Sequence, residues 1–359
     1  MQLDSNCFNA SMLTLARTYR MLSQRTLSTT TGIPQTALYR FEAGIAHPSD
    51  DEIRRLSENL NFPKKFFCNN SKIYPPATPF HRKKITASKK FVESAEALGN
   101  IQRIQINNML SQLELDEFDV NITMMPIDED GVVSSDPVRI AQYTRRSFGL
   151  PKGPIENMTK LLEDHGVIIS FARFESPKID GFTLRGGMGE HPMIFLNDVF
   201  QGEKYRMTLA HELGHIVMHQ MPSDTCEDEA WAFASEFLMP ADEIVRVLPH
   251  RLTNIRQLVP IKQEWKVSMK SLVKRSSDLG VIDKRTASYL YSQLAPYGVQ
   301  EPLPLEKEKP LLIQALIDFY EKEMEYSEDE LLSFLWIEKD MFDEWYGKNK
   351  VKPKFTFAK

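Results

Sequence analysis

Two histidines in "TLAHELGHIVMH", residues 208–219, place the strongest constraint on what this chain can fold into. They stand four residues apart, and on an α-helix residues i and i+4 lie one turn apart on the same face. The rings of His211 and His215 can therefore converge on one metal ion. Glu212 is offset to the side of that face, where its carboxylate can reach a water molecule and act as a general base. The spacing predicts a helix with a catalytic zinc centre held by the two histidines.

A third metal ligand is expected on a second helix, "CEDEAWAFASEFLMP" at residues 226–240. Its apolar residues recur at helical spacing and its first turn is acidic, so a carboxylate there can face the histidine pair. Glu229 is the preferred third ligand, with Glu227 and Asp228 as lesser candidates. An acidic turn that only complements the helix dipole is the alternative interpretation. Gly214 is a poor helix residue, which indicates close approach of this second helix.

Two further positions near the pair do not fit a ligand role. A third histidine six residues after His215 would extend the site, but that position is Met221. His219 lies one further turn along the same face, and three ligands in a straight i, i+4, i+8 line cannot surround one ion tetrahedrally. We therefore expect His219 to support the metal ligands or to pack beside them.

A second motif, "SQRTLSTTTGIPQTALYRFEAG" at residues 23–44, has the spacing of two short helices joined by a tight turn. Gly32 stands at the turn, where it tolerates the positive φ that lets the second helix leave at a steep angle. The exposed face of such a second helix reads the DNA major groove. A helical module that never touches DNA is the alternative. The predicted DNA contacts are Gln24 to a phosphate, and Gln35, Thr36, Tyr39 and Arg40 to the bases.

The charge distribution favours a nucleic-acid contact at the N-terminal part of the chain. Residues 1–90 hold 14 Lys and Arg against 6 Asp and Glu, a balance of +8, whereas the whole chain carries −5. The remaining residues hold 30 against 43, a balance of −13. A basic module on an acidic body is typical of a protein that binds nucleic acid through one part only. Basic residues that merely keep a small domain in solution are the alternative.

The rest of the chain predicts a small sheet among helices. Residues 89–118 carry apolar residues at helical spacing and predict a long connecting helix or helical pair, with a dimer surface as one use. Two apolar runs, 167–171 and 193–196, predict strands before the metal-binding helix. In the helical last third, Ser327 with Glu330 predicts a capped helix start. Its aromatic residues are expected in a core, with a ligand- or partner-sensing role as the alternative.

The cysteines and the lack of a long apolar run indicate the compartment in which the protein is expected to act. Cys7, Cys68 and Cys226 form no CxxC pair, which argues against a disulfide framework or a cysteine zinc site and for a reducing cytoplasm. No stretch approaches the roughly 18 apolar residues of a membrane span, and the first residues lack a secretory signal. We therefore expect a cytoplasmic protein without a membrane segment.

Both motifs resemble known families. Residues 12–67 resemble the XRE (lambda-repressor-like) family, whose usual alanine is Ser28 here. "YRMTLAHELGHIVMH" and "EDEAWAFASEFLMP", with "GPIENMTKLLEDHGVII" before them, are similar to the ImmA/IrrE metallopeptidases over about residues 130–245. Trp231 stands where that signature usually has asparagine. The resemblance implies a cytoplasmic protein whose relatives cleave a repressor under DNA damage or stress. It also implies His211, His215 and Glu229 as zinc ligands and Glu212 as the base.

Together these patterns predict an α+β, mostly helical chain in four parts. The parts are a lambda-repressor-like helix-turn-helix domain (1–70), a linker with connecting helices (71–125), a small zincin-like metallopeptidase domain of a sheet plus the HExxH helix (126–245), and a C-terminal helical domain (246–359) with a sensory or partner-binding role.

The predicted function is that of a DNA-binding transcriptional regulator, as a homodimer on a double-stranded operator. Its gluzincin-like zinc endopeptidase, active or latent under the C-terminal helices, is expected to cleave a repressor or antitoxin-like protein in a stress, toxin–antitoxin or mobile-element response. The substrate peptide is expected along an edge strand at residues 193–196. The alternative is a regulator or antitoxin-like protein with a structural or sensory zinc site and no proteolysis.

Overall fold

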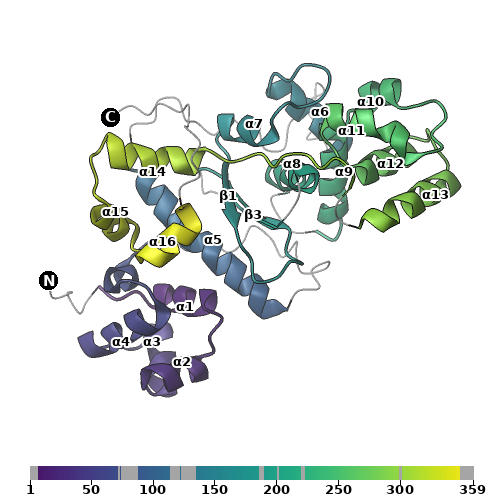
Figure 1. Ribbon diagram of the computed structural model, residues 1–359. Helices are drawn as coiled ribbons and strands as arrows, with labels where there is room; N and C mark the ends of the chain where they lie inside the picture. Colours follow the sequence, from purple (N-terminus) through teal and green to yellow (C-terminus); the bar gives the residue numbers. More distant parts are fainter. Residues whose placement is uncertain are drawn as a thin grey trace.

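The computed structural model describes residues 7–71, 73, 88–113, 122, 135–185, 190–199, 202–219, 223–298 and 301–347. In these residues helices surround one three-stranded sheet (Figure 1). The fold class is therefore the predicted one, α+β and mostly helical. Of the predicted linker with connecting helices, residues 72, 74–87, 114–121 and 123–125 lie outside the described residues. Among the described helices, none combines the length and the apolar composition that a membrane crossing requires.

Four short helices and one 3-10 turn form the N-terminal module. Gly32 ends the second of them in the left-handed region at φ +69°, as the predicted turn requires. Leu27, Ile33 and Leu38 are buried between the second and third helices. The helix-turn-helix predicted at residues 23–44 is present. The elements are α1 (Ala10–Tyr19), α2 (Gln24–Thr31), α3 (Gln35–Glu42), α4 (Asp50–Leu60) and η1 (Lys64–Cys68).

The helix α5 (Lys89–Leu110) runs through the centre of the molecule (Figure 1). On one side Ser94 Oγ donates a hydrogen bond of 2.7 Å to the carbonyl of Tyr19 in the N-terminal module. Further along, Gln105 Nε2 donates one of 2.8 Å to the carbonyl of Leu335, near the C-terminal end of the chain. Because most of its residues are buried within the same chain, α5 does not offer the dimer surface that its sequence suggested.

The sheet has the strand order β1-β3-β2, and β3 pairs in parallel with β1 and antiparallel with β2. The two runs predicted as strands are present as β1 and β3, whereas β2 was not predicted. The expectation that a peptide joins residues 193–196 as an edge strand is wrong, because both backbone edges of β3 are already paired. The strands are β1 (Ile168–Ala172), β2 (Gly181–Leu184) and β3 (Met193–Asn197).

The sheet separates two hydrophobic cores. Alternate residues of β3 point to opposite sides, so that Phe195 joins one core and Ile194 the other. The first core contains the N-terminal module, α5 and the last three helices, α14 (Leu312–Lys322), α15 (Glu328–Leu335) and α16 (Lys339–Tyr346). The second contains α6 (Pro137–Ser147), α7 (Met158–Asp164), α8 (Gly202–Met218), α9 (Cys226–Leu238), α10 (Ala241–Val247), η3 (Ile255–Leu258), α11 (Val259–Trp265), α12 (Met269–Asp278) and α13 (Lys284–Leu294), which η4 (Ala295–Tyr297) follows.

The segment predicted as one C-terminal domain, residues 246–359, is thus divided between the two cores. Its first helices pack with α8 and α9, whereas α14 to α16 return to the N-terminal module (Figure 1). There Arg20 Nη2 lies 2.8 Å from Sδ of Met341, and Asn61 Nδ2 donates a hydrogen bond of 2.9 Å to Asp340. The N-terminal module is therefore packed on the body of the chain.

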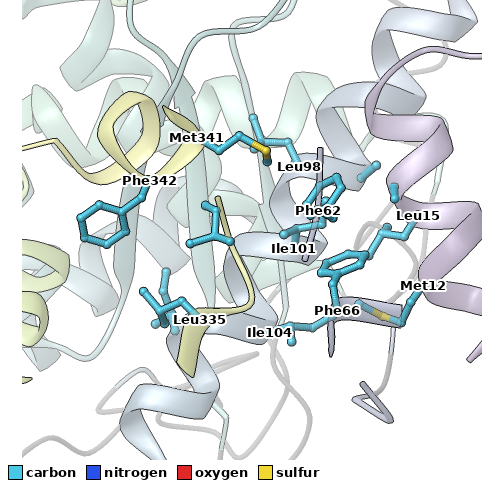
Figure 2. Close-up of a cluster of buried hydrophobic side chains, with 14 of the residues drawn as sticks. Met12, Leu15, Phe62, Phe66, Leu98, Ile101, Ile104, Leu335, Met341 and Phe342 are labelled. Carbon is cyan, nitrogen blue, oxygen red and sulfur yellow. The ribbon is translucent and has the colours of Figure 1, made fainter. Parts of the chain in front are cut away.

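Apolar side chains fill the junction between the module, α5 and the C-terminal helices (Figure 2). Phe62 and Phe66 come from the module, and Leu98 and Ile101 from α5 (Figure 2). The capping box predicted at Ser327 is present at the start of α15. The aromatic residues of the last helices pack in or against this core, as predicted: Phe334, Trp336, Phe342, Trp345 and Tyr346.

A disulfide joins Cys7, just before α1, to Cys68 at the end of η1. The disulfide joins the two ends of the N-terminal module. Beside it the backbone N–H of Asn9 donates a hydrogen bond of 2.7 Å to the carbonyl of Phe67. The expectation that the chain has no disulfide is wrong for this pair. Sequence spacing gave no signal for it, because the two cysteines are 61 residues apart and meet only through the fold.

Candidate metal centre

Two helices of the second core, α8 and α9, carry the candidate metal ligands and pack closely against each other. A Cβ added to Gly214 on α8 would lie 3.1 Å from the Phe233 ring and 3.4 Å from Cα of Ala230 on α9. Glycine therefore allows this close approach of the two helices, and the prediction made from Gly214 is confirmed.

Three donor groups converge at this contact. Nε2 of His211 lies 3.1 Å from Nε2 of His215. The carboxylate of Glu227 faces both rings, with Oε2 3.6 Å from His211 Nε2 and Oε1 3.4 Å from His215 Nε2. Glu227 Oε1 is buried and accepts no hydrogen bond from the described residues. A carboxylate whose two oxygens face two imidazole nitrogens fits a divalent metal ion.

The preferred third ligand from the sequence, Glu229, lies elsewhere. Its Oε2 is 3.0 Å from Nε2 of His219, and Nδ1 of His219 is 2.9 Å from Nδ1 of His215. Residues two apart on a helix do not share a face, so Glu227 and Glu229 cannot both point at the same pair of histidines. The structure brings Glu227 to that pair and Glu229 to the supporting histidine. The third candidate, Asp228, is exposed and lines a cleft that Trp231 also borders.

His219 is buried and connects the pair to Glu229. Burial, together with the neighbouring His215, lowers the pKa of His219 to about 4, so its ring is neutral near pH 7. A neutral imidazole donates through one nitrogen and accepts through the other. The ring can therefore accept from His215 while it donates to Glu229, which agrees with a supporting role.

Glu212 lies beside the three donors and is buried. Thr183 Oγ1, on strand β2, donates a hydrogen bond of 2.7 Å to its Oε2. Burial raises the pKa of Glu212 to about 6, although the charge of His215 and the Thr183 hydrogen bond act in the opposite direction. A carboxylate with a pKa near neutrality can both accept and release a proton.

Two contacts at the site were not predicted from the sequence: that of Thr183 with Glu212 and that of Trp231 with His211. Thr183 had no signal, because the strand that carries it was not predicted. Trp231, one turn after Glu227, packs against His211 with ring centroids 4.1 Å apart and the ring planes tilted by 35°. The spacing of four residues between Glu227 and Trp231 could have placed both on one face of α9. A cleft of about 690 Å³ opens beside Trp231, lined among others by Met207, Met239 and Lys274.

The residues predicted to contact DNA lie on α2 and α3. The four predicted base contacts are exposed on α3, with Tyr39 at 59 % exposure. Gln24, at the start of α2, donates a hydrogen bond of 2.8 Å from Nε2 to Glu42, and Glu42 also pairs with Arg17. The recognition face is thus available, whereas the Gln24 amide is held within the module. The exposed residues are Gln35, Thr36, Tyr39 and Arg40.

Comparison with protein families gives two matches. Residues 162–277 match a peptidase family model described as the IrrE N-terminal-like domain, and residues 15–67 match a helix-turn-helix model. No curated protein matches the chain. The class is thus a regulator type in which a DNA-binding domain is joined to a metallopeptidase-type domain. In particular, the chain fuses an XRE-type helix-turn-helix to an ImmA/IrrE-like domain, as its sequence predicts.

Proposed function

We propose that this chain is a DNA-binding transcriptional regulator with a gluzincin-like zinc endopeptidase that cleaves a regulatory protein of the repressor or antitoxin type. The observation that carries the proposal is the convergence of His211, His215 and Glu227 beside the buried carboxylate of Glu212. A purely structural metal site needs ligands but no adjacent base. The presence of Glu212 therefore favours an enzyme over a non-proteolytic site.

His211, His215 and Glu227 would hold the metal. Two imidazoles and one carboxylate are a typical catalytic zinc set, which leaves a fourth position open. Held by these three ligands, Zn²⁺ would polarise the peptide carbonyl and make a water molecule more acidic. We propose Glu227 in place of Glu229 as the third ligand because its carboxylate faces both histidines.

Glu212 would take a proton from the attacking water and deliver it to the leaving amine. Its pKa of about 6 supports both steps near neutral pH. Thr183 would hold the carboxylate in place through its hydrogen bond to Oε2, so that the other oxygen, Oε1, is the one that exchanges the proton.

The substrate peptide would join β2 as an added strand. Within the described residues β2 lies at an edge of the sheet, and Thr183 connects it to Glu212. An extended peptide pairs its backbone with such an edge, which brings its carbonyl groups past the neighbouring site.

The helix-turn-helix would bind double-stranded DNA with α3 in the major groove. Gln35, Thr36, Tyr39 and Arg40 are exposed there and carry groups that reach base edges. Gln24 would contact a phosphate after release from Glu42. We further propose a homodimer on a two-fold operator, as is usual for this motif, and action in the cytoplasm.

The proposal is tested by Glu212→Gln, which removes the base and keeps the shape of the side chain. Labelling of protein N-termini in cells that express wild type should reveal new cleavage products that are absent with the variant. Elemental analysis should find equal zinc in both proteins. The same cleavage products with Glu212→Gln would refute the mechanism, and no products with either protein would favour the non-proteolytic alternative. For the ligands, Glu227→Ala should lose the ion held by His211 and His215, and the matched control Asp228→Ala, an exposed residue of the same turn, should keep it.

A further inference from the structure

A second cluster of possible metal ligands adjoins the first. His219, Cys226 and Glu229 each offer one ligand atom, and these atoms lie within 4.8 Å of one another. Nε2 of His219 is 3.0 Å from Oε2 of Glu229. Cys226, the first residue of α9, is outside the disulfide and only 1 % exposed. None of these three residues belongs to the ligand set proposed for the catalytic centre.

The donor chemistry of the second cluster differs from that of the first. A thiolate, an imidazole and a carboxylate suit zinc and other thiophilic divalent ions, whereas the first cluster has only nitrogen and oxygen donors. Arg185 lies within electrostatic range of Cys226 and His219. The Glu229 carboxylate, and the Cys226 thiolate that forms when a metal ion displaces the thiol proton, would set two negative charges against this one positive charge.

We propose that His219, Cys226 and Glu229 form a second metal site, which binds a thiophilic divalent cation such as Zn²⁺. Three protein ligands leave one position for water or for a group from a bound partner. The site itself stands on the geometry of its own residues. Only its effect on the peptidase, argued next, rests on the proposed function.

The two sites compete through the hydrogen bond of 2.9 Å between Nδ1 of His215 and Nδ1 of His219. An ion on Nε2 of His215 leaves the proton of that ring on Nδ1, which then donates to His219. His219 must in turn carry its proton on Nε2, the nitrogen that the second ion needs. Filling both sites therefore breaks the hydrogen bond between the rings. We expect the second ion to bind roughly 5- to 100-fold more weakly when the first is present. In excess metal, an ion bound at the second site would in turn weaken the binding of the first ion at the catalytic centre.

Cobalt(II) titration of the metal-free full-length protein tests the second site. Cobalt bound to a thiolate gives a near-ultraviolet charge-transfer absorption, which nitrogen and oxygen ligands do not give. We expect two bound ions in wild type, with the charge-transfer band following the weaker one. Cys226→Ser should remove the band and retain one ion, and Glu229→Gln should weaken the band-forming ion. The double variant Cys7→Ser and Cys68→Ser is the matched control and should keep the band.

Further variants separate this proposal from the proposed catalytic centre. His211→Asn combined with Glu227→Gln should lose the first ion and keep the charge-transfer band. The absence of a band in wild type, or a band that survives in Cys226→Ser, would overturn the second site. Circular dichroism of each variant shows that the chain has folded, so loss of the band can be assigned to the missing ligand.

Discussion

Glu163, on α7, is a buried carboxylate that connects the two sides of the sheet and makes stability depend on pH. Its oxygens accept backbone hydrogen bonds of 3.0 and 3.1 Å from Leu311 and of 3.0 Å from Leu312, at the start of α14. Burial raises its pKa from 4.5 to about 7, against the effect of those hydrogen bonds and of nearby Lys160. Glu163→Gln keeps the shape and one acceptor oxygen but removes the charge.

The direction in which stability changes with pH follows from the raised pKa of Glu163. An acid whose pKa is higher in the folded state stabilises the fold while it is protonated, and loses that contribution as pH rises. For Glu163 the contribution is complete below pH 4.5 and is lost as pH rises through about 7. At about 1.4 kcal/mol per pKa unit the loss is about 3 kcal/mol. The variant loses one acceptor contact, about 1 kcal/mol. It should therefore be about 2 kcal/mol more stable than wild type near pH 8.

Urea unfolding of the full-length protein at pH 5 and pH 8, followed by circular dichroism, measures this difference. The matched control is Asp164→Asn, which changes an exposed carboxylate on the same helix. Its stability relative to wild type should change little between the two pH values. If the stability difference between wild type and Glu163→Gln is the same at both, the reasoning from burial is refuted.

Three further predictions concern the site, the junction and the DNA surface. Thr183→Val removes the hydrogen bond that positions Glu212, so peptidase activity should fall about 10- to 100-fold with zinc content unchanged. Equal activity would contradict this role of Thr183. Phe62→Ala opens a cavity between the module and α5 and should lower the free energy of unfolding by about 3–5 kcal/mol, measured by chemical denaturation. A loss below about 1 kcal/mol would contradict the packing. Arg40→Ala should weaken binding to DNA selected from a random pool by about 1–3 kcal/mol and relax specificity at one base pair. Equal affinity for the selected sequence would remove Arg40 from the base contacts.

The features that the sequence could predict depend on residues close together along the chain. The turn at Gly32 follows from its neighbours, and the structure gives it the positive φ that was expected. The spacing of His211 and His215 places both rings on one helical face, and they meet at 3.1 Å. The lack of a side chain at Gly214 predicted the close approach of α9. In each case a rule within about one helical turn decides the outcome.

The features that the sequence could not predict depend on distant segments. Strand β2 has only four residues, and its pairing with β3 defines it. The choice between Glu227 and Glu229 depends on how α9 is rotated about its axis against α8. The contact of Phe233 with Gly214 helps to fix that rotation, and it exists only in the folded chain. The disulfide of Cys7 depends in the same way on the return of the chain after α4.

The arrangement of the two cores also concerns the hypothesis that C-terminal helices shield the peptidase site until a signal arrives. Helices α14 to α16 share a core with the N-terminal module and α5, on the side of the sheet that carries Phe195. The candidate metal centre lies on α8 and α9, on the side that carries Ile194. The last three helices therefore pack on the other side of the sheet from the candidate centre. The helix that borders the cleft beside Trp231 is α12, through Lys270 and Lys274. A signal that reaches the candidate centre would thus be expected to act on α12, within the segment 246–359, or through β2 and Thr183, rather than on α14 to α16.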